Sequence, residues 1–369
     1  MKSSSIRRLI DFDGNRSNNF TLIRLVFAWA VLYGHSYAIQ AADGYSDPLN
    51  RLFAGSTWVG AIAVEGFFAI SGFLVTASLM KRDAIDYIIS RSLRIVPGLT
   101  VCVFICVFLL GSLASELPIS DYFESTQTFT YLRNSLAFIP MQWELPGVFV
   151  DNTRTAVNGS LWTLNVEVYC YVLLLVLGTF ALVKYAAIAN GFLVVLFLFS
   201  LKFYPNLPLI GINEAWARPS LYFLLGVFFY VNRKYIVLHW VLAITSLVLC
   251  LASFGKSWYQ YVFPLAFVYL LFYTAYATKH IDMDRSLGDI SFGFYIYAWP
   301  TQQVIASSLP SASPYINTLI STVITGALAW MSWTYVEKPA LSLKQWLMNL
   351  RNGLKNASAK PDINSPSQQ

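Results

Sequence analysis

Ten apolar stretches, each near the length of a membrane-spanning helix, constrain this chain more than any other feature of its sequence. A helix needs about 20 mainly apolar residues to cross a bilayer. The stretches lie at 20–40, 56–79, 97–113, 161–183, 185–203, 216–232, 236–254, 259–277, 290–308 and 314–336. Only 12% of the residues are charged, whereas soluble domains carry about 25%, so the polar surface that a soluble fold needs is missing. The sequence therefore predicts an all-α, polytopic integral membrane protein with ten transmembrane helices.

The basic residues predict how these helices are oriented. An even number of spans puts both termini on one side of the membrane. If the N-terminus is cytoplasmic, 18 of the 25 Lys and Arg residues fall on the cytoplasmic side and six on the outer side. Cytoplasmic loops carry such an excess of basic residues, so we expect both termini in the cytoplasm. The net charge of +6 is then explained by topology and does not indicate nucleic-acid binding.

Two segments outside the predicted spans are long. The outer loop at about 114–160 is net acidic, and loops of this length commonly bind a ligand or form a lid. The cytoplasmic tail at 341–369 is predicted to begin as an amphipathic helix around Trp346 and Leu350 and to end in a disordered segment. We expect the remaining residues, 1–340, to form one transmembrane domain.

The cysteines do not indicate a metal site. Cys102, Cys106, Cys170 and Cys250 all lie inside apolar stretches, without a Cys/His cluster at metal-ligand spacing. A thiol in an apolar environment is hard to ionise. We interpret the four cysteines as small hydrophobic residues and expect no metal.

A few ionisable residues lie inside the apolar stretches, where they are costly and default to functional hypotheses. Arg24 and His35 are eleven residues apart, close to three helical turns, so both project from one face with a rise of roughly 16 Å. Counting from the helix ends puts His35 and Glu167 at the same depth and Glu65 slightly lower, so that a carboxylate can orient the imidazole. The alternative is that Arg24 snorkels to the interface and His35 is a satisfied core histidine, with the carboxylates in a structural polar network that links helices.

Arg91 and Arg94 form a second candidate site. They lie on a predicted cytoplasmic loop just before Pro97, which opens the third stretch. Guanidinium groups at this spacing share one helical face and suit a phosphate, which they bind bidentately. Charge alone favours the other interpretation, in which both residues only anchor the loop on the cytoplasmic side.

These residues together resemble the membrane-bound acyltransferase-3 family, whose members O-acetylate bacterial surface glycans. Arg24 and His35 reproduce the family's spacing of Arg and His, and Arg91, Arg94 and Pro97 resemble its basic loop motif. Similar motifs are Glu65 followed by Phe67, Phe68, Ile70, Ser71, Gly72, Phe73 and Leu74; Ser160, Leu161, Trp162, Thr163, Leu164 and Glu167; and, more weakly, Arg218, Phe223, Leu224, Leu225 and Gly226. The resemblance covers most of the membrane portion. Many relatives carry a fused esterase-like domain, so this chain resembles the stand-alone members.

The resemblance implies an acyltransferase of the bacterial inner membrane that moves an acetyl or other acyl group from cytoplasmic acetyl-CoA to a glycan hydroxyl on the periplasmic side. The phosphates of the acyl-CoA are expected to bind Arg24, Arg91 and Arg94. The pantetheine arm then extends along the helix face between Arg24 and His35, a distance comparable to its reach.

Catalysis is assigned by the same resemblance to His35 as general base, with Glu167 orienting it or balancing its charge. Glu65, which stands where the family frequently has Asp, is a further candidate. Direct transfer and a transient acyl-His35 intermediate both stay open. Ser71 and Ser160 are interpreted as packing hydroxyls, because small hydroxyls in membrane helices more often serve helix contacts than nucleophilic attack.

The acceptor is expected to be a surface polysaccharide such as the O-antigen of lipopolysaccharide, free or linked to lipid. The main alternative is a transporter or flippase, and a membrane scaffold or sensor is a third class. Transporters commonly contain repeats with interrupted helices in matching halves. The sequence shows no such symmetry, and its intramembrane polar residues concentrate in the first four stretches.

Overall fold

The computed structural model describes residues 7–15, 17–41, 44–53, 55, 57–180, 185–203 and 214–358. Its helices and strands, in chain order, are β1 (Arg7–Arg8), α1 (Phe20–Ile39), α2 (Pro48–Leu52), α3 (Val59–Lys81), α4 (Ala84–Phe104), α5 (Ser112–Ala114), α6 (Ile119–Glu124), α7 (Thr126–Thr130), α8 (Trp162–Thr179), α9 (Ala186–Phe203), α10 (Glu214–Val231), β2 (Val237–Leu238), α11 (Trp240–Ser253), α12 (Tyr259–Ala277), α13 (Met283–Ser286), α14 (Ser291–Ser308), α15 (Pro314–Ser332) and α16 (Lys338–Ser358). Short 3₁₀ or π-helical turns form η1 (Leu9–Phe12), η2 (Ile105–Gly111), η3 (Tyr131–Leu136), η4 (Gly159–Leu161) and η5 (Trp333–Glu337).

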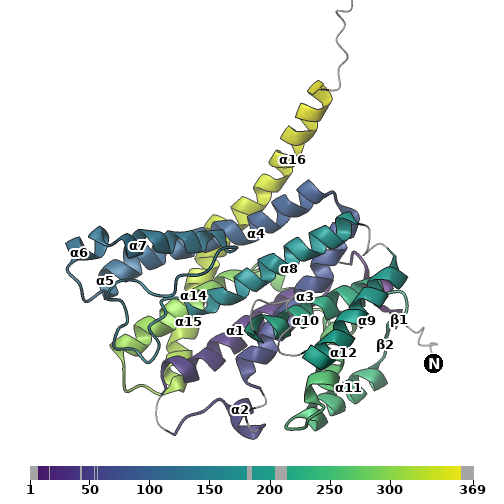
Figure 1. Ribbon diagram of the computed structural model, residues 1–369, viewed down its shortest axis with the longest axis horizontal. Coiled ribbons are helices and arrows are strands. Elements are labelled where there is room, and N and C mark those ends of the chain that lie inside the picture. Colours follow the sequence, from purple (N-terminus) through teal and green to yellow (C-terminus); the bar gives the residue numbers. More distant parts are fainter. Residues whose placement is uncertain are drawn as a thin grey trace, which may run out of the picture.

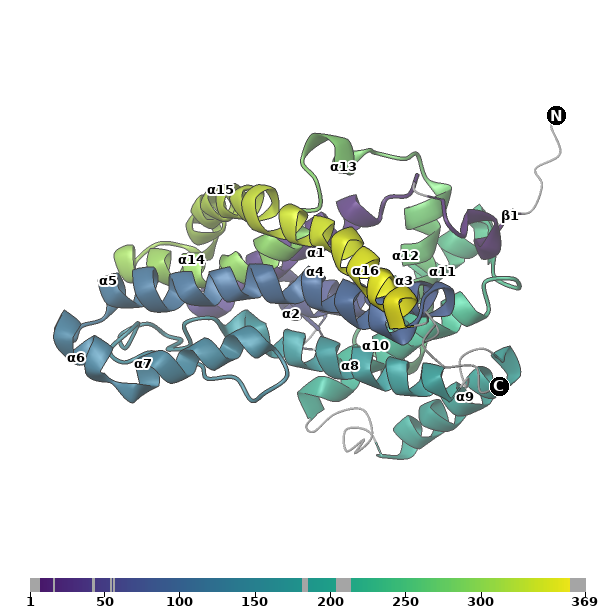
Figure 2. The same cartoon turned by 90° about the horizontal axis from the view of Figure 1, so that it is seen from above.

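The long helices form one bundle with different segments at its two ends. The short helices α5, α6 and α7 gather at one end in both views, and β1 lies at the opposite end (Figures 1 and 2). β1 pairs antiparallel with β2, with Arg7 opposite Leu238. The segment predicted to be the long outer loop and the N-terminal segment are thus separated by the length of the bundle, as a chain that crosses a membrane requires.

Each of the ten predicted stretches contains a helix, and within the described residues six helical segments are long and apolar enough to cross a membrane. These six are Phe20–Ile39, Val59–Lys81, Ala84–Ala114, Gly159–Thr179, Tyr259–Ala277 and Pro314–Arg351. Shorter apolar helices cover Ala186–Val195, Trp216–Val231 and Trp240–Ser253. The architecture is that of an all-α membrane protein. The number of ten crossings and the cytoplasmic location of both termini stay predictions.

The third long helix begins earlier than predicted. We expected it to open at Pro97 and placed Arg91 and Arg94 in the preceding loop, but α4 begins at Ala84 and continues through Pro97. The Asp83 carboxylate accepts a hydrogen bond from the backbone N–H near the helix start, an N-cap that stabilises a first turn. Apolar content alone could not reveal this start, because the first turns of α4 are amphipathic and mix isoleucines with Asp86, Arg91 and Arg94. Both arginines therefore project from a helix into the bundle.

α3 is the central helix, and it packs most extensively against α10 and α1. A Cβ atom at Gly72 would lie 2.0 Å from the carbonyl oxygen of Phe223, and one at Gly226 would lie 2.1 Å from that of Ala69. These two glycines let the backbones of α3 and α10 touch, as small residues commonly do between membrane helices. The close contact fixes one side of α3 and leaves the other side to line the candidate site.

Residues 143–161 turn back into the bundle before α8 begins. The indole N–H of Trp299 on α14 donates to the carbonyl oxygen of Ala156 at 2.9 Å, and the Asn158 side-chain amide donates to that of Ile296 at 2.8 Å. Irregular backbone at membrane depth is tolerated only where protein or water satisfies its polar groups, and the Trp299 indole of α14 does so for Ala156. The re-entrant segment, as we call residues 143–161, makes α8 begin inside the bundle and not at its end.

Two further expectations concern the cysteines and the tail. All four cysteines are buried free thiols. The amphipathic helix expected in the tail is α16, which projects from the body of the bundle (Figure 1). Residues 359–369, which contain the segment predicted to be disordered, lie outside the described residues.

Candidate active site

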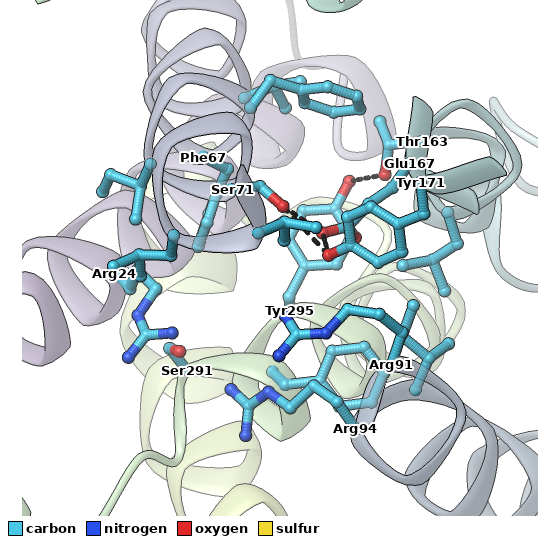
Figure 3. Close-up of a pocket in the computed structure, with 18 residues that line it drawn as sticks. Arg24, Phe67, Ser71, Arg91, Arg94, Thr163, Glu167, Tyr171, Ser291 and Tyr295 are labelled. Carbon is cyan, nitrogen blue, oxygen red and sulfur yellow. Dashed lines mark hydrogen bonds between the residues drawn. The ribbon is translucent and has the colours of Figure 1, made fainter. Parts of the chain in front are cut away.

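A pocket between α1, α3, α4, α8 and α14 brings together four of the six predicted site residues. Arg24, Arg91, Arg94 and Glu167 all line it, and its empty volume is about 810 Å³, counting the part open to solvent. The three arginines come from two helices far apart in sequence, yet their guanidinium groups converge on one side of the pocket (Figure 3). The structure therefore brings the three expected phosphate-binding residues to one place.

The pocket is charged at one end and apolar at the other. The side of α3 that lines it runs from Val75 to Val64, about 16 Å of helix at 1.5 Å per residue. Arg24, Arg91 and Arg94 lie on one side in Figure 3, and Phe67 lies away from them. The remaining lining at the Phe67 end is apolar or aromatic: Val64, Phe68, Leu164 and Tyr295, with Thr163. Such a pocket fits a ligand with an anionic head and a long, largely apolar arm.

Asp289 holds two of the arginines in position. Its Oδ2 atom lies 3.0 Å from Nη2 of Arg24 and 2.7 Å from Nη2 of Arg94, and Ser291 Oγ donates to its Oδ1 at 2.7 Å. Burial raises the pKa of Asp289, but the charges of Arg24 and Arg94 outweigh that effect and hold the pKa at about 2. The carboxylate is therefore ionised at neutral pH. Because each guanidinium has five N–H donors, both arginines can bind a second anion as well.

Glu337 is a second carboxylate near these arginines. It ends η5, a π-helical turn, and its Oε2 lies 3.7 Å from Nη1 of Arg94, while Ser332 Oγ donates to its Oε1 at 2.9 Å. Single π-helical turns are frequent at functional sites. We predicted neither Glu337 nor Asp289 as a site residue. A carboxylate at the end of an apolar stretch was the available signal for Glu337, whereas Asp289 lies in a short loop where a carboxylate is ordinary.

Arg91 is the least engaged of the three arginines. None of the ion pairs in the described part of the chain involves Arg91, and its buried Nε has no hydrogen-bond partner there. Its guanidinium carbon lies 5.9 Å from the centre of the Tyr171 ring. Arg91 therefore presents its charge to the pocket without a carboxylate to balance it.

Glu167 is bound by two hydroxyl groups on the pocket wall. Ser71 Oγ donates to Glu167 Oε1 at 2.9 Å, the Tyr171 hydroxyl donates to the same oxygen, and the two hydroxyls lie 2.9 Å apart. Ser71, which we interpreted as a packing residue, thus binds a carboxylate, and Tyr171 was not predicted. The cluster gives the middle of the pocket a strong hydrogen-bond acceptor.

His35 lies outside the pocket lining, in a slot between two indole rings. Its ring centre is 4.7 Å from that of Trp299 and 5.7 Å from that of Trp58, and its buried Nδ1 has no hydrogen-bond partner in the described part of the chain. Trp299 is one helical turn beyond Tyr295, which does line the pocket. His35 is therefore just beyond the apolar end of the pocket.

The depth expected for Glu167 relative to His35 is not found. Gly34, which directly precedes His35 on α1, marks the level of His35 on α3, because a Cβ on Gly34 would lie 3.0 Å from the backbone nitrogen of Gly60. Ser71, the hydrogen-bond partner of Glu167, is eleven residues further along α3 than Gly60. Eleven helical residues span roughly 16 Å, so Glu167 lies far from the level of His35, toward the arginine end of the pocket. The count assumed that α8 starts at the outer membrane surface, whereas the re-entrant segment makes it start deeper. The catalytic roles of both residues stay predictions.

Glu65 faces away from the pocket and pairs with Arg218. Arg218 Nε lies 2.5 Å from Glu65 Oε1, and Arg218 Nη2 donates to the hydroxyl of Tyr259 at 3.0 Å. Glu65 is only 2% exposed. The structure thus gives this carboxylate a partner on α10. We had expected it near His35, and that expectation was wrong.

Glu65→Ala is expected to lower the free energy of unfolding by about 3 kcal/mol, because it leaves Arg218 without its buried counter-ion. The value is at the low end for a buried pair, since the Arg218 side chain is 31% exposed. Thermal unfolding in detergent measures the effect, with the exposed Glu116→Ala as control. A Glu65→Ala protein that is as stable as the control but inactive would instead assign Glu65 to catalysis.

Gly159→Ala is expected to disturb the slot around His35. A Cβ at position 159 would lie 2.5 Å from Cζ2 of Trp299, and such overpacking typically costs about 1–3 kcal/mol. Because Trp299 contacts His35, activity should fall together with the melting temperature. Gly191→Ala, where no atom lies within 4 Å of the added Cβ, is the matched control. Equal behaviour of the two variants in both measurements contradicts the expected link.

Comparison with known proteins agrees with the resemblance noted from the motifs. The model of a family described as an acyltransferase domain matches residues 17–335, a range that includes all six predicted site residues. An O-acetyl transferase from Shigella phage Sf6 is 31% identical over 362 residues, which cover 89% of this chain and 97% of the relative. Nodulation protein 10 from Rhizobium leguminosarum bv. viciae is 26% identical over 363 residues, covering 90% and 96%. No solved structure matches the chain.

Proposed function

The chain belongs to this acyltransferase family, and from that premise we propose that it transfers an acetyl group from acetyl-CoA to a hydroxyl group of a cell-surface glycan at the bacterial inner membrane. The similarity to an O-acetyl transferase over most of both chains supports O-acetylation. The observation that carries the choice of donor is the pocket itself, which has three arginines at one end and an apolar wall at the other.

Acetyl-CoA binds with its phosphates against Arg24, Arg91 and Arg94 and with its pantetheine arm along α3. Guanidinium groups bind phosphate oxygens bidentately. The positive-inside bias supports a cytoplasmic location for the arginine end of the pocket, on the side where acyl-CoA is made. The amide groups of the arm pass the carboxylate of Glu167, which can accept a hydrogen bond from them. The thioester then lies near Phe67, at the end of the pocket closest to His35.

His35 acts as the general base at the outer side of that end. A hydroxyl group of the glycan gives its proton to His35 while its oxygen attacks the carbonyl carbon of the thioester. The C–S bond breaks, and the proton held by His35 passes to the departing CoA sulfur. The products are an acetyl ester and free CoA, so His35 is regenerated.

The acceptor is a polysaccharide such as O-antigen, free or lipid-linked, that approaches from the periplasmic end of the bundle. The re-entrant segment supports this route, because its Ala156 binds the same Trp299 that contacts His35. A glycan held by the segment around 114–160 would present its hydroxyl group to His35 and to the thioester at the apolar end of the acyl-CoA pocket.

Incubation of the purified protein with radiolabelled acetyl-CoA and glycans extracted from a strain that lacks the gene tests the proposal. We expect label to appear in an alkali-labile ester on one glycan. A transporter or flippase would move the glycan across proteoliposomes without labelling it. Absence of label from every surface glycan that loses acetyl groups in the deletion strain would overturn the proposed activity.

A further inference from the structure

The imidazole of His35 lacks the carboxylate partner that the sequence predicted. The level of Glu167 is roughly 16 Å from that of His35, and Glu65 pairs with Arg218. None of the ion pairs among the described residues involves His35. A histidine that acts as a base takes up a proton at one ring nitrogen, and the hydrogen bond made by the other nitrogen decides which one is free. Another group is therefore needed to bind the second nitrogen.

The aromatic rings on either side of His35 do not supply this group. Trp299 and Trp58 flank the imidazole, and an indole has one N–H donor and no acceptor for a proton on Nδ1. The indole N–H of Trp299 is itself bound to the carbonyl oxygen of Ala156. The Nδ1 atom of His35 is buried and has no hydrogen-bond partner in the part of the chain that the structure describes. A proton on Nδ1 thus needs an oxygen from another side chain or from a bound molecule.

Gln302 on α14 has a buried oxygen that can accept such a bond. Its side chain is 0% exposed, and its Nε2 donates to the carbonyl oxygen of Leu32 at 2.8 Å and to Ser36 Oγ at 2.7 Å. These bonds use both N–H groups of the amide. They also fix its orientation, because exchange of oxygen and nitrogen would put Oε1 against the Leu32 carbonyl. Oε1 has no hydrogen-bond partner among the described residues.

Gln302 and His35 lie at the same turn of α1. Leu32 and Ser36, both bound by Gln302, are three residues before and one residue after His35. On α14, Trp299 comes three residues before Gln302, about 4.5 Å along the helix, and its ring packs against His35. α14 therefore presents the Trp299 ring and the Gln302 amide next to each other to this turn. The two buried atoms without a partner, Nδ1 and Oε1, belong to side chains held at one place.

We propose that Gln302 is the positioning residue of His35. Its Oε1 accepts the Nδ1–H, directly or through one bound water molecule, and Nε2 is left free to take the proton of the glycan hydroxyl. An amide suits this place better than the predicted carboxylate, because a buried carboxylate without a cationic partner is costly. The inference rests on the proposed function, because it takes His35 to be the base.

Nuclear magnetic resonance of the protein in detergent, with isotope-labelled histidine rings, tests the contact without requiring transfer. The chain has three histidines, and the signals of His35 are those that His35→Gln lacks. We expect the neutral His35 ring to carry its proton on Nδ1. Gln302→Leu, which offers no acceptor, should shift the population by about tenfold toward the form with the proton on Nε2, the effect of one lost hydrogen bond. Gln302→Glu keeps an acceptor oxygen and should restore the wild-type form.

Gln40→Leu is the matched control for lost packing and lost hydrogen bonds. Gln40 is buried, and its amide donates to the carbonyl oxygens of Leu309 and Pro310, after the end of α14. This variant should leave the His35 ring in its wild-type form. In transfer assays kcat of Gln302→Leu should fall by about tenfold or more, a part of what a positioned base contributes, with unchanged KM for acetyl-CoA. Gln302→Glu should recover most of kcat.

The outcomes separate this contact from the proposed function. A wild-type His35 ring with its proton on Nε2 would overturn the contact, as would a Gln302→Leu protein that keeps the proton on Nδ1 or a Gln40→Leu protein that loses it to the same extent. Unchanged kcat in Gln302→Leu with an altered ring would overturn the positioning role. The expected ring forms in a protein that labels no glycan would support the contact and contradict the proposed transfer.

Discussion

Replacement of His35 by Ala is expected to lower the rate of acyl transfer by about 10²- to 10⁴-fold, the contribution of a positioned general base, with nearly unchanged affinity for acetyl-CoA. The two effects separate because His35 does not line the acyl-CoA pocket but lies beyond its apolar end, against Trp299. Transfer of label from acetyl-CoA to glycan measures the first quantity, and competition binding measures the second.

His35 fills a slot between Trp58 and Trp299, so His35→Ala could also lose activity through a packing defect, which a second variant must exclude. His35→Gln fills much of the same volume without a titratable base and should be as inactive as His35→Ala. His280→Ala, at an exposed position, should transfer normally. Wild-type transfer by His35→Ala would remove the catalytic assignment. An acyl group recovered on His35 after a quench with acid would favour the covalent intermediate over direct transfer.

The three arginines line one pocket, as a common role in binding phosphate requires, and that role stays a prediction. Arg24 was found because an arginine inside an apolar stretch is costly and needs a reason. Arg91 and Arg94 were found from their spacing and their resemblance to a basic motif, although they were placed in a loop. The spacing argument survives the change from loop to helix, because residues three apart share a helical face. The pocket that joins them to Arg24 follows from packing between helices, which the sequence does not encode locally.

The relation between His35 and Glu167 could not be predicted because depth was counted from the ends of apolar stretches. That count holds for a helix that starts at the membrane surface. α8 instead starts inside the bundle, after a segment whose backbone is held by side chains of α14, among them Trp299. The partners of the segment lie about 140 residues away in sequence, as for Asn158 and Ile296. No local pattern of apolar residues reports such a contact.

Buried partners explain the other differences. Glu65 was predicted near His35 from its depth along the helix, but its direction around the helix axis was not considered. Residues Val64, Phe67 and Phe68 face the pocket, whereas Glu65 is turned toward Arg218 on α10. Depth along a helix and direction around it are independent coordinates, and both must agree before two side chains can meet.

Arg91→Ala is expected to raise the Kd of acetyl-CoA by about 10- to 100-fold, because a hydrogen bond to a charged group is worth about 1.5–3 kcal/mol and each 1.4 kcal/mol is a factor of ten. Arg91 is the best of the three arginines for this test. Arg24 and Arg94 both bind Asp289, so removing either also leaves that buried carboxylate with one cationic partner fewer. Arg91 forms no ion pair with another described residue, and its loss should be felt chiefly by the ligand.

Acetyl-pantetheine, which has the thioester and the arm but no diphosphate, separates charge from shape in this test. If Arg91 binds phosphate, Arg91→Ala should lower the affinity for acetyl-CoA and leave the affinity for acetyl-pantetheine unchanged. Arg91→Lys should recover part of the lost affinity, because lysine supplies a point charge without the planar guanidinium fork. Arg133→Ala, at an exposed position in the segment after α7, should not alter either affinity. An equal loss for both ligands would mean that Arg91 shapes the pocket through Tyr171 and does not bind phosphate, and unchanged affinity for acetyl-CoA would remove Arg91 from the donor site.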